Sequence, residues 1–253
     1  MLGIDLAGKK ALVTGGSRGV GAAAARLLAW AGADVGISYR SRSAEADALV
    51  EELSGVGVHA WAHPGDLSDP EAVRALFDRA RQAFGALDIL VASAGVWPPE
   101  DVPIARMSDA QWRRTMGVNL DGVFYCVREA AGMIREGGRI VLVGSTAGQR
   151  GEAFHGDYAA SKGALGSLVK GVAGELAPRD VTVNCVAPGW IDTEMAAGPY
   201  AGGGRERIEA TIPLGRVASA EDVAGPIVFL CSPLGRHITG EVLNVNGGAV
   251  LCG

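Results

Sequence analysis

The sequence predicts an α/β fold in which a doubly wound parallel sheet of about seven strands carries helices on both faces. The chain has 253 residues and is 48% hydrophobic, which is enough for a large core. Seven short segments rich in Val, Ile and Leu lack strict polar alternation, as expected for strands buried on both faces of a parallel sheet. Longer segments of helical length separate them.

The predicted strands and helices alternate from one end of the chain to the other. Strands are expected over 11–14, 34–39, 58–62, 88–93, 139–143, 181–187 and 241–245. Helices are expected over 22–31, 44–53, 70–84, 109–136, 158–176 and 220–231. No linker or internal repeat interrupts this order, so we expect one domain over residues 1–253.

One segment does not fit either pattern. Residues 189–212 follow the sixth strand and contain Gly202-Gly203-Gly204. We expect an irregular substrate loop there, above the carboxyl edge of the sheet, because ligands bind at that edge in such folds.

Composition argues against several classes of partner. The net charge of −5 argues against a nucleic-acid surface. The longest uncharged run, 53–65, is too short to cross a bilayer, and the first ten residues contain Asp5 and no apolar signal core. The four cysteines are far apart and the carboxylates are scattered. We therefore expect a cytoplasmic protein with no membrane partner, no metal site and buried thiols.

The first predicted strand runs into a glycine-rich loop, which a helix-forming segment follows. Glycines let the backbone approach a pyrophosphate closely, and the N-terminus of the next helix offers free N–H groups and a positive dipole end. The loop therefore predicts a dinucleotide site on a Rossmann-type sheet, with an ordinary strand–helix turn as the alternative. Its residues are Thr14, Gly15, Gly16, Ser17, Arg18, Gly19, Val20 and Gly21.

The end of the second strand favours NADP(H) over NAD(H). A site for NAD usually places an acidic residue there to bind the ribose 2′-hydroxyl. This chain instead has Arg40, Ser41 and Arg42, and its first acid is Glu45. Arg18 adds a third guanidinium, and guanidinium pairs well with a 2′-phosphate. The alternative is that these arginines are solvated charges at a helix start.

A tyrosine and a lysine four residues apart indicate proton transfer. Tyr158 and Lys162 lie in a predicted helix, on one face and about one turn apart. A nearby ammonium is expected to lower the pKa of the phenol from about 10 toward the range of general acid–base catalysis. Ser145 follows the fifth strand, where its hydroxyl is placed to hold a carbonyl oxygen. The alternative is an ordinary helix with a surface Tyr and Lys.

Together these motifs resemble the short-chain dehydrogenase/reductase family along nearly the whole chain. Within the family, the sequence is most similar to the 3-oxoacyl-(acyl-carrier-protein) reductase-like members. It departs from the family at Ser93, where Asn is common, and at Asn246, where Asp is common. The matching segments are TGGSRGVG (14–21), Asp66-Leu67, Ala94-Gly95, Val118-Asn119-Leu120, Ser145, YAASK (158–162), PGWIDT (188–193) and NVNGG (244–248).

The resemblance implies roles for individual residues. Tyr158 would protonate the carbonyl oxygen that Ser145 positions. Lys162 would bind the nicotinamide ribose, and Asn119 would hold a water that links Lys162 to solvent. Besides the glycine loop, Tyr158 and Lys162, the implied cofactor contacts are Arg40, Ser41, Asp66, Leu67, Ser93, Ala94, Gly95, Pro188, Gly189, Ile191 and Thr193.

Four residues are candidates for the substrate side. Trp97 and Trp190 each follow a cofactor motif and are candidates for apolar walls of a pocket, with ordinary packing as the alternative. Gln149 lies just past Ser145, and His155 precedes Tyr158 by three residues, where a loop or helix-start histidine is the alternative.

These observations predict an NADPH-dependent oxidoreductase. The expected reaction is the reversible reduction of a small carbonyl compound, a ketone or a 3-oxoacyl thioester, to a secondary alcohol by hydride transfer. A non-catalytic protein of the same fold that senses NADP(H) is the alternative. The resemblance also implies a homotetramer assembled through 109–136 and the helix that carries Tyr158.

Overall fold

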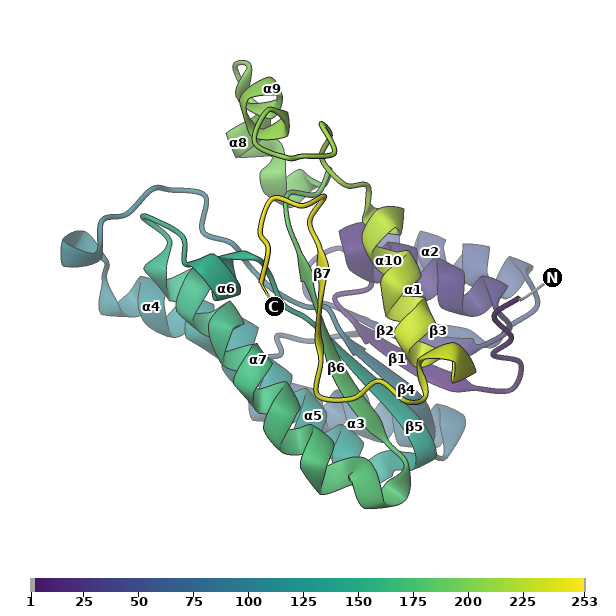
Figure 1. Ribbon diagram of the computed structural model, residues 1–253. Coiled ribbons are helices and arrows are strands. Elements are labelled where there is room, and N and C mark those ends of the chain that lie inside the picture. The colour runs from purple at the N-terminus through teal and green to yellow at the C-terminus, as the bar shows by residue number, and fades with distance from the viewer. Residues whose placement is uncertain (1–2, 253) are drawn as a thin grey trace.

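Seven parallel strands form one twisted sheet at the centre of the molecule (Figure 1). The computed structural model describes residues 3–252. The strand order is β3-β2-β1-β4-β5-β6-β7, which confirms the predicted Rossmann-type, doubly wound fold. The strands are β1 (Lys10–Thr14), β2 (Asp34–Tyr39), β3 (Ala60–Pro64), β4 (Leu87–Ala92), β5 (Ile134–Val143), β6 (Thr182–Pro188) and β7 (Val242–Val245).

Helices bury both faces of this sheet. One face carries α1 (Gly19–Trp30), α2 (Ser43–Gly55) and α10 (Ala220–Cys231). The other carries α3 (Pro70–Phe84), α5 (Gly122–Met133) and α7 (Gly156–Leu176). Leu12 and Val13 are consecutive in β1 yet belong to opposite clusters, because successive strand side chains point to opposite faces. This two-sided burial explains why the strand segments are continuously apolar.

The predicted helix over 109–136 is wrong. The segment contains α4 (Asp109–Met116), a π-helical turn η2 (Gly117–Asp121) and α5, and β5 already begins at Ile134. Ile134 joins the sheet early because it pairs with Leu87 across a register shift. The third strand likewise begins at Ala60 and not at 58, since its pairing with β2 starts there.

The segment after β6 is more ordered than predicted. It contains three short helices, η4 (Glu194–Ala196), α8 (Ala197–Tyr200) and α9 (Gly204–Glu209). Figure 1 shows α8 and α9 projecting beyond the sheet, above β6 and β7. The remaining short helices are η1 (Ile104–Arg106), α6 (Ala147–Arg150), η3 (Ala177–Arg179) and η5 (Pro233–Gly235).

Three cysteines are buried, but the prediction of buried thiols is wrong for Cys252, which is exposed beyond β7 near the chain end. Within residues 3–252, no helix has both the length and the apolar character needed to cross a membrane. The same residues contain no cluster of three His, Cys, Asp or Glu side chains that could hold a metal ion.

Candidate active site

A cavity of about 440 Å³ lies over the carboxyl ends of the central strands. It occupies the point where the strand order reverses, between β1 and β4, which is where open α/β sheets bind ligands. Its volume is in the range of small-molecule sites. Of the residues predicted to contact the cofactor, all but Thr14 and Gly16 line this cavity.

Thr14 supports the cavity from within the sheet. Its hydroxyl oxygen accepts hydrogen bonds from the backbone N–H groups of Ser93 and Ala94, both at 3.1 Å. These bonds tie the end of β1 to the loop after β4. The side chain of Thr14 therefore holds the backbone at Ser93, the position where the sequence departs from the family pattern.

Only glycine fits at one position in the loop before α1 and at one position in the first turn of α1. Gly15 has a φ of +65°, and a Cβ there would lie 2.8 Å from the Cα of Ala94. A Cβ at Gly21 would lie 2.3 Å from the Gly15 carbonyl oxygen. Arg18, which precedes α1, provides no side-chain cap, so the N–H groups of the first turn remain free for an anion.

Three arginines line the cavity near this loop, and the protein itself supplies their counter-ions. Arg18 and Arg42 both donate to the same carboxylate oxygen of Glu194, at 2.8 and 2.9 Å. Arg40 lies 3.8 Å from an oxygen of Asp66. No sequence motif predicts Glu194 as a member of the site, because its partner Arg18 lies 176 positions away in the chain.

Ser145, Tyr158 and Lys162 line the same cavity. Ser145 follows β5, whereas Tyr158 and Lys162 lie one turn apart on α7. The ammonium of Lys162 donates to the Val143 carbonyl at 2.7 Å and lies 6.0 Å from the centroid of the Tyr158 ring. Burial lowers the pKa of Lys162 to about 8.

The predicted fall in the pKa of Tyr158 is wrong for this structure. Burial raises that pKa, the Ser145 hydroxyl acts in the opposite direction, and the charge of Glu152 raises it further. Lys162 does not offset the effect of burial on the pKa of Tyr158, because its ammonium donates to the Val143 carbonyl. The phenol consequently keeps its proton at neutral pH.

Asn119 is buried in the π-helical turn η2 and does not line the cavity. Its side chain exchanges two hydrogen bonds with the backbone of Val96, at 2.8 and 2.9 Å, and donates to the Ser161 hydroxyl at 3.2 Å. A Cβ at Gly95 would lie 3.3 Å from the side-chain amide oxygen (Oδ1) of Asn119 and 3.4 Å from the Lys162 ammonium. Asn119 is thus close to Lys162, and its predicted water-holding role remains a prediction.

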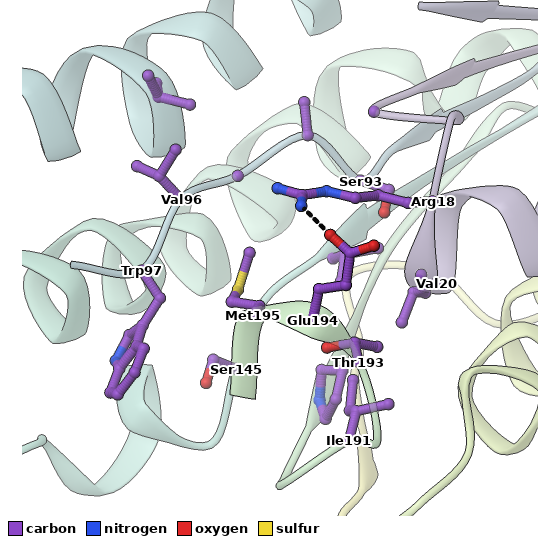
Figure 2. Close-up of a pocket in the computed structure, with 18 of the residues that line it drawn as sticks. Arg18, Val20, Ser93, Val96, Trp97, Ser145, Ile191, Thr193, Glu194 and Met195 are labelled. Atoms are coloured by element: carbon purple, nitrogen blue, oxygen red, sulfur yellow. Dashed lines mark hydrogen bonds and ion pairs between the residues drawn. The ribbon is translucent and has the colours of Figure 1, made fainter. Parts of the chain in front are cut away.

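Two of the four candidate substrate residues line the cavity, Trp97 and Trp190. Gln149 does not, because its amide donates to Asn244 of β7 at 2.6 Å. His155 does not either, because its ring is buried behind Trp97, with the ring centroids 4.5 Å apart. The cavity also contains residues that the sequence analysis did not select, among them Val96, Met195 and Glu194 (Figure 2).

A ligand cavity at the switch point of a doubly wound sheet, with a Tyr–Lys pair at its wall, defines a nucleotide-dependent oxidoreductase. A family model described as enoyl-(acyl carrier protein) reductase matches residues 15–250. The chain belongs to the short-chain dehydrogenase/reductase family.

Individual relatives match over almost their whole length. The NADPH-dependent aldehyde reductase-like protein, chloroplastic, of Arabidopsis thaliana is 40% identical over 98% of this chain and 96% of its own. The 3-oxoacyl-(acyl-carrier-protein) reductase FabG of Aquifex aeolicus is 40% identical over 97% and 98%. A short chain dehydrogenase of Burkholderia cenocepacia, solved in complex with NADP, superposes with a TM-score of 0.91 at 41% identity and covers 96% and 98%.

Proposed function

We propose that this oxidoreductase is an NADPH-dependent carbonyl reductase that reversibly converts a ketone into a secondary alcohol. The observation that carries the proposal is that one cavity joins three arginines at one end with Ser145, Tyr158 and Lys162 at the other. The NADP named in the Burkholderia cenocepacia structure and the NADPH in the name of the Arabidopsis thaliana relative support this choice of cofactor.

The residues present fit such a cofactor. The glycine loop leaves no room for a Cβ at Gly15 or Gly21, which is the close backbone approach that a pyrophosphate requires. The guanidinium groups near the second strand suit a 2′-phosphate. When bound, the nicotinamide supplies or accepts a hydride.

The side chains at the other end of the cavity would donate the proton and stabilise the negative charge that develops on the carbonyl oxygen. Tyr158 would donate its proton to the carbonyl oxygen during reduction, since a phenol whose pKa is raised by burial is protonated at neutral pH. Ser145 would hold the same oxygen by a hydrogen bond as negative charge develops on it. Lys162 would position the nicotinamide ribose.

Replacing Tyr158 by Phe tests the proposal directly. Tyr158→Phe is expected to bind NADPH as the unchanged protein does and to lose about 10²- to 10⁴-fold in kcat, because the proton donor is gone. Binding is measured by NADPH fluorescence titration and turnover by NADPH oxidation over a panel of ketones. Tyr125→Phe, on α5 and away from the cavity, is the matched control and should retain turnover.

Retention of most turnover by Tyr158→Phe would refute its role as proton donor. NADPH binding by the unchanged protein without reduction of any carbonyl would instead favour a non-catalytic, NADP(H)-sensing protein.

The expected homotetramer is also a proposal. Phe124 on α5 is 43% exposed and Trp112 on α4 is 39% exposed, so these two helices present large apolar side chains to the surface. Burial of these side chains against further copies of the chain would account for them. Light scattering that gives the mass of a single chain would contradict this.

A further inference from the structure

Two tryptophans that line the cavity are each backed by a second aromatic ring outside it. Trp97 stacks on His155, with ring centroids 4.5 Å apart and planes at 13°. Trp190 packs on Tyr200, with centroids 6.0 Å apart. The two indoles meet edge to face at 6.2 Å and 81°. The four rings therefore form one continuous aromatic wall.

Hydrogen bonds hold the two backing rings in place. Nε2 of His155 lies 3.0 Å from the Pro98 carbonyl oxygen, and the Tyr200 hydroxyl donates to the Ile191 carbonyl at 2.9 Å. His155 is buried, so its ring cannot turn away from Trp97 without losing this packing. The wall is thus formed before a substrate arrives, which reduces the entropy cost of binding.

The wall faces the reacting end of the cavity. Figure 2 shows the Trp97 ring, the Ser145 hydroxyl and the Met195 side chain grouped around one space. Val96 adds a further apolar side chain to the lining. A carbonyl held by Ser145 would place the rest of its molecule against these apolar groups.

The arginines near this end already pair with carboxylates. Arg150 donates to Glu152 at 2.9 Å, and Arg205, whose guanidinium lies 5.6 Å from the centroid of the Tyr200 ring, donates to Asp192 at 2.7 Å and to Glu209 at 3.1 Å. The ammonium of Lys162 donates to the Val143 carbonyl and would hold the nicotinamide ribose. The other arginines of the cavity wall in the described chain, Arg18, Arg40 and Arg42, lie around the proposed cofactor phosphates. Among the described residues, a negatively charged substrate would find no arginine beside the tryptophans that lacks a carboxylate partner, whereas an uncharged aromatic ring gains face and edge contacts there.

We propose that the natural substrate is an uncharged ketone that carries an aromatic ring, and that His155 and Tyr200 are positioning residues for the two tryptophans. This inference rests on the proposed function. The carbonyl carbon receives a hydride from NADPH, which is oxidised to NADP⁺, and the oxygen takes the proton of Tyr158. The product is the corresponding secondary alcohol.

Three matched 3-oxo compounds test the substrate class by NADPH oxidation. They are ethyl 3-oxo-4-phenylbutanoate, ethyl 3-oxohexanoate and 3-oxohexanoyl coenzyme A. Ethyl 3-oxo-4-phenylbutanoate is expected to exceed ethyl 3-oxohexanoate by about tenfold in kcat/KM. The anionic 3-oxohexanoyl coenzyme A is expected to be no better a substrate than ethyl 3-oxohexanoate. A preferred thioester, or no advantage for the phenyl group, would overturn the inference. Reduction of any of the three compounds would leave the proposed function standing.

Variants then locate the selectivity in the wall. Trp97→Leu and, independently, Trp190→Leu are expected to reduce the ratio of kcat/KM between the two ethyl esters by about tenfold. His155→Ala is expected to raise KM for ethyl 3-oxo-4-phenylbutanoate while KM for NADPH stays constant. Trp30→Leu, on the exposed side of α1, is the matched control and should keep the ratio. An unchanged ratio in both Trp97→Leu and Trp190→Leu would show that the aromatic wall does not determine the preference for the phenyl-bearing substrate.

Discussion

Arg18, in the loop before α1, and Glu194, the first residue of η4, form an ion pair of 2.8 Å across the cavity (Figure 2). The same oxygen of Glu194 accepts a hydrogen bond from Arg42 at 2.9 Å. Two of the three guanidinium groups that line this end of the cavity therefore already share one carboxylate. An incoming 2′-phosphate would compete with Glu194 for them.

Glu194→Gln should strengthen the binding of NADPH because it removes that competing charge. The pair is exposed, so the expected gain is modest, about a two- to fivefold fall in KM for NADPH. KM for NADH should change less, since NADH lacks the 2′-phosphate. The measurement is KM for both cofactors at low and high salt, because screening should reduce the difference. Glu206→Gln, on α9, is the control, and a rise in KM for NADPH in Glu194→Gln would contradict the competition.

Arg40→Ala should remove most of the preference for NADPH. A hydrogen bond from guanidinium to phosphate contributes about 1.5–3 kcal/mol, so the ratio of kcat/KM for NADPH over NADH should fall by about ten- to a hundredfold. Both efficiencies are measured with one saturating ketone. Equal efficiency of the two cofactors in the unchanged protein would show that the arginines do not select NADPH.

The stability of the protein should depend on pH through Lys162. Its pKa is about 8 when folded, against a usual value of 10.5, so the unfolded chain binds this proton more tightly. The free energy of unfolding should therefore rise as the pH increases from 8 to 10.5. Below pH 8 the burial of the Lys162 ammonium lowers the free energy of unfolding by its full amount, about 3 kcal/mol.

Lys162→Met tests this linkage. It should be more stable than the unchanged protein at pH 7, and this advantage should shrink toward pH 10, while turnover is lost. Urea denaturation at the two pH values measures the difference. Lys170→Met, an exposed position on the same helix, should show no such dependence. An advantage of Lys162→Met that is equal at both pH values would disprove the linkage.

Gly148→Ala should disturb the contact between α6 and α7. A Cβ there would lie 2.6 Å from the backbone N of Gly163, so α6 must move away from the helix that carries Tyr158. We expect a loss of about 1–3 kcal/mol in the free energy of unfolding and a fall in kcat, because Ser145 lies at the start of the same turn.

Gly171→Ala, on α7, is the control, since a Cβ there would meet no atom within 4 Å beyond the neighbouring backbone of its own helix and should stabilise that helix by about 1 kcal/mol. Thermal unfolding and steady-state kinetics compare the two variants. Equal stability of both would mean that the close approach at Gly148 is readily relieved.

Much of the site was predictable because its motifs are local in sequence. The loop around Gly15 follows a strand directly, and Tyr158 and Lys162 are neighbours on one helix. Glu194 was not predictable, since its partner Arg18 is brought close only by the fold. His155 was one candidate for a substrate contact, with a helix-start histidine as the alternative, and the structure places it at the start of α7 with its ring stacked on Trp97.

The order of apolar runs and helical segments in the sequence alone predicted the parallel sheet, and local motifs predicted the glycine loop and the Tyr158–Lys162 pair. Only the tertiary structure decided that the segment from Asp109 breaks at a π-helical turn, that Tyr158 has a raised pKa, and that two tryptophans form a wall near Ser145. The physical reason is that periodicity and spacing act along the chain. Desolvation and ring packing depend instead on groups that only the folded chain brings together.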